Sequence, residues 1–109
     1  MSVDHVKLSK AERQADEALV VGYHEARLGD LLERVREGFE RYDSGELDPF
    51  ELDELIHHYK RAARELWKFC GDRTHGRSAS FIARTLEEMQ EHSETIDWWE
   101  RGNPERRRR

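Results

Sequence analysis

The stretch DPFELDELIHHYKRAARELWKFCG, residues 48–71, decides the fold class of this chain. Asp48 is a typical helix N-cap, Pro49 suits the first helical position, and Glu51 completes a capping box. After it, apolar residues recur at steps of three and four, which places them on one helix face: Leu52, Leu55, Ile56, Tyr59, Ala62, Ala63, Leu66 and Cys70. The pattern predicts a helix over residues 49–70 that stops at Gly71, because glycine tolerates the conformation that often follows a helix.

The segment before this helix also reads as helical, but it carries two apolar stripes. Ser9 opens a second capping box with Glu12. Alternating steps of four and three, the pattern of closely packed helices, join Leu28, Leu32, Val35, Phe39 and Tyr42. An upstream apolar group around Ala15 and Leu19 lies about 130° away around the axis. The divergence indicates either a break near Gly29 or one long helix with two neighbours. We predict the break, with helices over about 10–28 and 31–43.

A third helical region is expected over about residues 79–101, ended by Gly102. Its most unusual feature is the pair Trp98-Trp99. In an unbroken helix Trp98 would point away from the apolar face and would need a partner, since aromatic residues are enriched at interfaces. Alternatively, the helix breaks near Ser93 and both indoles fold back. Both alternatives stay open, and Trp98 and Trp99 are the candidate interface residues.

The composition favours helices packed into one domain. The chain has 109 residues, of which 39% are charged, and a mean hydropathy of −1.03. This balance suits amphipathic helices with long solvated faces. A chain of this length buries one modest core. We therefore predict an all-α bundle of three or four helices over residues 1–102, followed by a flexible, disordered basic tail over 103–109.

Charge and cysteine content bound the partners and the compartment. The net charge is −5, so the chain as a whole repels nucleic acid and anionic membranes. A nucleic acid contact is expected only through the arginine tail: Arg106, Arg107, Arg108 and Arg109. The single Cys70, with no apolar run long enough for a membrane span, predicts a cytoplasmic protein that does not insert in a membrane.

The stretch GDRTHGRSAS, residues 71–80, resembles a phosphate-binding loop only superficially. A true loop of that class follows a buried strand and carries a lysine, whereas this one follows a helix and has Arg77 at that position. Free amides at the next helix start could still hold an anion. The candidate anion-binding residues are Arg73, Arg77, Ser78 and Ser80, and a plain loop with capping serines is the alternative.

No metal, cofactor or catalytic residue is predicted. Glu54 and His57 have the Glu-x-x-His spacing of di-iron bundles, but the helical projection turns them away from the apolar face. Cys70 and His75 would need two further zinc ligands that the local sequence lacks. Cys70 lies at the end of a helix on its apolar stripe, so we expect a buried thiol and no nucleophile.

Two resemblances bear on function. The stretch YKRAARELWKFC, residues 59–70, with DWWERG, residues 97–102, resembles small uncharacterised helical proteins of high-GC Gram-positive bacteria, which implies a bundle and no known activity. The segment around Ser44-Gly45-Glu46-Leu47, between two amphipathic helices, is similar to the helical hairpin of the small subunit of exodeoxyribonuclease VII. That similarity implies a non-catalytic subunit that assembles on a nuclease.

The sequence thus favours association over catalysis. We expect a non-catalytic protein-interaction or accessory module that forms a homodimer or binds another protein, because one small domain has difficulty covering both upstream stripes and Trp98. The alternatives are an accessory small subunit of a nuclease-like complex and an anion- or metal-binding helical protein.

Overall fold

The longest element is helix α1, Lys10–Asp43, in a computed structural model that describes residues 9–71 and 78–104. It begins at the predicted capping box: the Ser9 hydroxyl accepts from the Glu12 amide at 3.0 Å, and the Glu12 carboxylate accepts from the Ser9 amide at 2.8 Å. These two bonds satisfy amides that an uncapped helix end would leave unpaired.

The predicted break near Gly29 is wrong, because α1 continues through it as a single helix of 34 residues. The two halves of α1 instead pack against two different helices. In the C-terminal half Gly38 lies against Leu55 of the second helix, and in the N-terminal half Asp16 forms an ion pair with Arg84 of the third. Glycine costs only about 1 kcal/mol inside a helix, so packing on both sides of Gly29 outweighs it.

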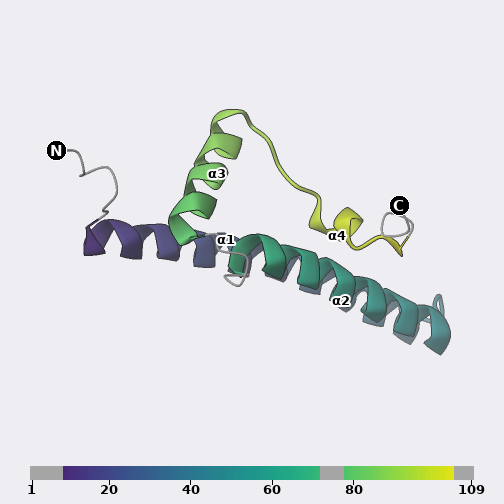
Figure 1. Ribbon diagram of the computed structural model, residues 1–109. Coiled ribbons are helices and arrows are strands. Elements are labelled where there is room, and N and C mark those ends of the chain that lie inside the picture. Colours follow the sequence, from purple (N-terminus) through teal and green to yellow (C-terminus); the bar gives the residue numbers. More distant parts are fainter. Residues whose placement is uncertain (1–8, 72–77, 105–109) are drawn as a thin grey trace.

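Helix α2, Pro49–Gly71, returns antiparallel to α1 and confirms the helix expected there. Its capping box is present: Asp48 accepts from the Glu51 amide at 2.7 Å, and Glu51 accepts from the Asp48 amide at 2.9 Å. The turn before it uses Gly45, whose φ of 86° lies in the left-handed region. Together α1 and α2 form a long helical hairpin, which spans the width of Figure 1.

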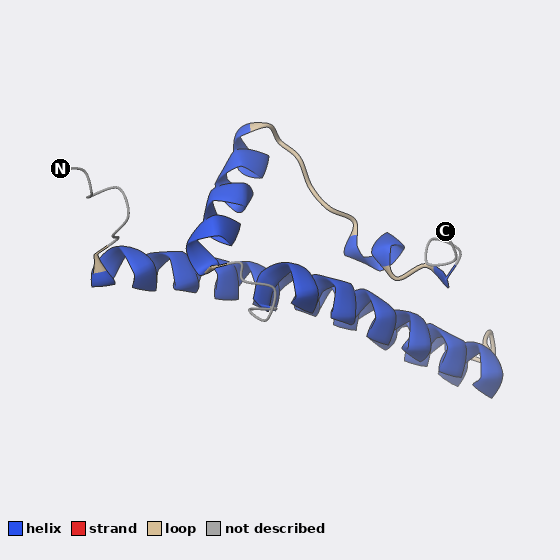
Figure 2. Ribbon diagram, in the orientation of Figure 1, coloured by secondary structure: helices blue, strands red, loops and turns tan. Residues whose placement is uncertain are grey.

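The third helical region is broken, so the predicted helix over 79–101 is wrong in its second half. Helix α3, Ala79–Glu91, ends at a turn in which Ser93 takes a φ of 54°. An extended segment then leads to the short helix α4, Trp98–Arg101. The alternative with a break near Ser93 is the one that the structure adopts (Figure 2).

The four helices of the described residues all contribute to one core, which confirms the all-α fold. The buried residues that make up this cluster are Val20, Leu31, Ala62, Leu66, Cys70, Ile82, Ala83, Leu86 and Trp98. Residues 9–71 and 78–104 contain no strand. Of the tail predicted over residues 103–109, Asn103 and Pro104 are described and half-buried, and residues 105–109 lie outside the described residues.

The molecule is strongly elongated. Its principal extents are 66 × 29 × 26 Å and its Cα radius of gyration is 17.7 Å, whereas a globular domain of this length has about 13 Å. In Figure 1, α3 and α4 both rise from the same side of the α1–α2 hairpin. The hairpin therefore has one face that the rest of the described chain covers and one that it leaves open.

Candidate association surfaces

Helix α4 covers one face of the hairpin through a set of polar contacts with α2. The His58 imidazole donates from Nε2 to the Trp99 carbonyl at 2.7 Å and stacks on the Trp99 ring at 4.0 Å. Arg61 donates from Nε to the Gly102 carbonyl at 2.8 Å. Gly102 lies directly on the Ala62 backbone. This side of α2 is therefore occupied.

The two tryptophans predicted as interface residues belong to this packing. Trp98 is only 4% exposed, and its indole Nε1 donates to the Tyr23 hydroxyl of α1 at 2.9 Å. Trp99 is half-buried between His58 and the Arg34 guanidinium, which lies 5.1 Å from its ring centre. Trp98 is thus an internal residue and not the solvent-facing contact that an unbroken helix would make it.

The uncovered side of the hairpin carries an apolar stripe on α1, which extends the predicted four-and-three pattern by one heptad towards the N-terminus. Its residues are Val21, Leu28, Leu32, Val35, Phe39 and Tyr42. Leu28 and Val35 are half-buried, whereas Leu32 is 48% and Phe39 46% exposed. At about 100° per residue the centre of the stripe lies roughly 80° around the α1 axis from the buried Gly38.

A matching stripe runs along α2 on the same side. Ile56 and Ala63 are half-buried and Trp67 is 49% exposed. Helix α4 contacts α2 through Arg61 and contacts α1 through Arg34, so it lies on one side of the hairpin. In the helical projection, the apolar stripes of α1 and α2 both point to the other side. The two stripes therefore share the hairpin side away from α4, and we call these nine residues the hairpin face.

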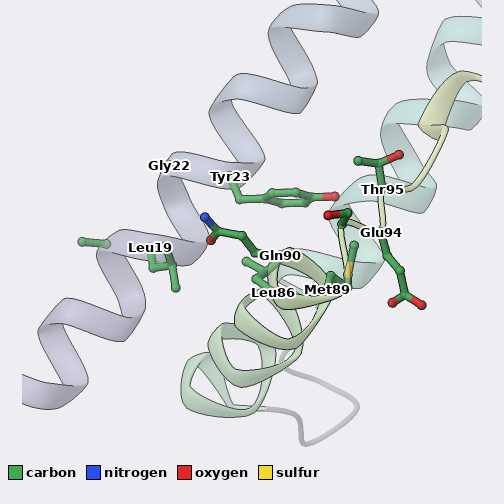
Figure 3. Close-up of a pocket in the computed structure, with 10 residues that line it drawn as sticks. Leu19, Gly22, Tyr23, Leu86, Met89, Gln90, Glu94 and Thr95 are labelled. Carbon is green, nitrogen blue, oxygen red and sulfur yellow. The ribbon is translucent and has the colours of Figure 1, made fainter.

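A second surface is an open groove between α1 and α3, with a volume of about 640 Å³. Figure 3 shows Leu19 and Tyr23 of α1 on one wall and Leu86 and Met89 of α3 on the other. The extended segment after α3 closes the third side through Glu94 and its neighbours. The lining is mostly apolar. The groove was not predictable from the sequence, because its third side forms only where the chain turns back at Ser93, after the end of α3.

The predicted anion site lies only partly within the described residues. Arg73 and Arg77 lie outside the described residues. Ser78 is the N-cap of α3, and its hydroxyl accepts from the Phe81 amide at 3.2 Å, as the plain capping alternative requires. Ser80 is half-buried within the first turn of α3.

Among the candidate metal and nucleophilic residues, Glu54, His57 and Cys70 lie on α2, and His75 lies outside the described residues. Glu54 and His57 both point to solvent, as the helical projection predicts, with side chains 70% and 58% exposed. Within residues 9–71 and 78–104, no three His, Cys, Asp or Glu side chains group closely enough to hold a metal ion. Cys70 is buried, and burial raises the pKa of its thiol to about 11, which keeps it protonated and unreactive at neutral pH.

Comparisons with protein-family models, curated proteins and solved structures found no match to this chain. They do not bear on the two resemblances, which stay expectations. In the described part of the chain no helix has an apolar stretch long enough to cross a membrane.

Proposed function

We propose that this protein is a non-catalytic helical association module that binds another polypeptide through the hairpin face. The observation that carries the proposal is the exposure of large apolar side chains on the same side of two neighbouring helices, such as Leu32 on α1 and Trp67 on α2. Single exposed apolar residues are ordinary, whereas a contiguous apolar patch marks an interaction site.

The elongated shape supports the same proposal. The hairpin gives a long, rigid platform, and α3 and α4 pack on its other side. Rigid helical faces lose little conformational entropy when they bind, so the apolar area that they bury is used efficiently. The lone Cys70 fits work in a reducing compartment such as the cytoplasm.

Site-specific cross-linking in the source cell tests the proposal. A photo-reactive amino acid in place of Leu32 samples the hairpin face, and the same residue in place of Leu19 samples the α1–α3 groove as a control of similar exposure. We expect a covalent adduct with a polypeptide from position 32 and little from position 19. An absence of polypeptide adducts at position 32 would overturn the proposal.

A further inference from the structure

We infer that the polypeptide bound by the hairpin face is a second copy of this chain, so that two hairpins form a four-helix core with α3 and α4 on the outside. This inference rests on the proposed function and adds the identity of the partner. Three features of the hairpin face support a second copy: its pattern, its area and its flanking charges.

The pattern of the α1 stripe suits packing against another helix of the same kind. Residues from Leu28 to Tyr42 alternate in steps of four and three, which is the seam of helices that cross at a small angle. In the monomer that seam is only partly used, because α2 contacts α1 at Gly38 and leaves Leu32 and Phe39 nearly half exposed. A second hairpin supplies the missing neighbour.

The area is sufficient for a reversible dimer. Val21 to Tyr42 spans about 32 Å along α1 at the ordinary helical rise. Two packed helices present a face about 20 Å wide. Two such faces bury roughly 1,200 Å² in total, which is the lower end of the range for specific interfaces. We therefore expect a micromolar dissociation constant.

The charges beside the face are arranged for self-pairing. On the outer edge of α1, Glu25 lies towards one end of the face and Arg36 towards the other. The outer edge of α2 carries the opposite charges at matching heights along the hairpin. Arg64 lies near the height of Glu25, and Asp53 lies near the height of Arg36. These heights follow from the antiparallel alignment of α1 and α2, in which the ring of Tyr23 on α1 lies next to the ring of Phe69 on α2.

A two-fold axis parallel to the helices brings α1 of one copy against α2 of the other. Glu25 then faces the partner's Arg64, and Arg36 faces the partner's Asp53. A two-fold axis perpendicular to the helices also pairs opposite charges. It would, however, place Lys60, near the middle of α2, opposite Lys60 of the second copy, and the two positive charges would repel each other. We therefore assign the parallel axis. In the monomer Arg36 already pairs with Glu33 at 3.0 Å, an exposed pair that costs little to rearrange.

Light scattering coupled to size-exclusion chromatography tests self-association with two matched variants. The wild type is expected to elute as a dimer of the 13.0 kDa chain at about 100 μM, well above a micromolar dissociation constant. Leu32→Asp places a charge in the seam and is expected to give a monomer. Leu19→Asp makes the same change at a similarly exposed position in the groove and is expected to leave the dimer intact.

Circular dichroism of both variants confirms that the helices are retained. A monomeric wild type, a dimer that survives Leu32→Asp, or a dimer broken by Leu19→Asp alone would each overturn self-association through the hairpin face. A monomeric wild type whose position 32 still cross-links to a different protein would leave the proposed function standing, so the two failures are distinguishable.

Charge reversal tests the assigned arrangement. Glu25→Arg alone is expected to weaken dimerisation several-fold, since it sets two positive side chains opposite each other. Adding Arg64→Glu in the same chain restores the opposite signs across the dimer and is expected to recover most of the loss. A double variant as weak as the single one contradicts the parallel axis.

Discussion

At the scale of single residues, the attachment of α4 depends on the absence of one methyl group. A Cβ at Gly102 would lie 2.6 Å from the Ala62 backbone nitrogen and 2.9 Å from its Cα. Both are backbone atoms in the middle of α2, so they have little freedom to move away. Gly102 has a φ of −89°, which any residue adopts, and the constraint is therefore purely steric.

We expect Gly102→Ala to destabilise the protein by about 1–3 kcal/mol, the usual cost of overpacking. Gly29→Ala is the matched control, because a Cβ there meets no atom within 4 Å and alanine is the better helix former. That control should stabilise the protein by about 0.5–1 kcal/mol. Urea denaturation followed by circular dichroism measures both. Equal stability of the two variants would show that α4 is not held against Ala62.

The buried thiol gives a second prediction at this scale. Burial raises the pKa of Cys70 from 9.0 to about 11, and burial raises the pKa of the Tyr23 hydroxyl as well. Between about pH 9 and pH 11 the thiol ionises in the unfolded chain but stays protonated in the folded one, so unfolding releases protons. The free energy of unfolding should therefore fall as the pH rises through this window.

Denaturation curves at pH 8, 9, 10 and 11, roughly bracketing the titration, measure this effect. In Cys70→Ala the decline over the window should be shallower, although Tyr23 still contributes. A decline that is just as steep without Cys70 would contradict a buried protonated thiol.

At the scale of elements, α1 and α3 end with the same hydrogen-bond pattern but different residues. After α1 the Gly45 amide donates to the Tyr42 carbonyl and the next amide to Arg41; after α3 the Ser93 amide donates to Gln90 and the next to Met89. This is the Schellman pattern, in which the residue after the C-cap takes a left-handed conformation. Glycine adopts it without cost, whereas serine does not.

We therefore expect Ser93→Gly to stabilise the protein by up to about 1 kcal/mol, because it removes the strain of a φ of 54°. The reverse change, Gly45→Ser, should destabilise by a similar amount at its φ of 86°. Thermal unfolding of the two variants at equal concentration measures both. A loss of stability in Ser93→Gly would mean that the Ser93 side chain contributes more than its backbone strain costs.

The same elements show what the sequence could and could not predict. Helix α2 was predictable because its period, its capping box and its terminal glycine all lie within the helix or next to it. The end of α3 was not settled, since the turn residue is Ser93 and not glycine. The continuity of α1 was missed because packing by two different helices overrides a local preference at Gly29. The burial of Trp98 depends on Tyr23, which lies 75 positions away.

The candidate surfaces divide in the same way. The four-and-three stripe that ends at Tyr42 was visible in the sequence, since helical periodicity is local. Its exposure was not visible, because that depends on α4 covering the opposite side of the hairpin. The α1–α3 groove had no sequence signal, because it forms from the angle between two helices and the return of the chain at Ser93.

At the scale of the whole molecule, the shape of the dimer follows from which face is shared. The monomer is 66 Å long but only 29 and 26 Å across. The hairpin face runs along the long axis, so two copies that share it lie side by side. A dimer through the ends of the hairpins would instead approach twice the monomer length.

Small-angle X-ray scattering separates these shapes. We expect the dimer to keep a maximum dimension near the 66 Å length of one copy, with the added mass widening its cross-section. Leu32→Asp should give a particle of the same length and half the mass, which serves as the internal standard. Since a second copy stabilises only the folded chain, the thermal midpoint of the wild type should also rise with protein concentration, and that of Leu32→Asp should not. A dimer close to twice the monomer length would contradict side-by-side packing, because an end-to-end contact leaves Leu32, Phe39 and Trp67 exposed.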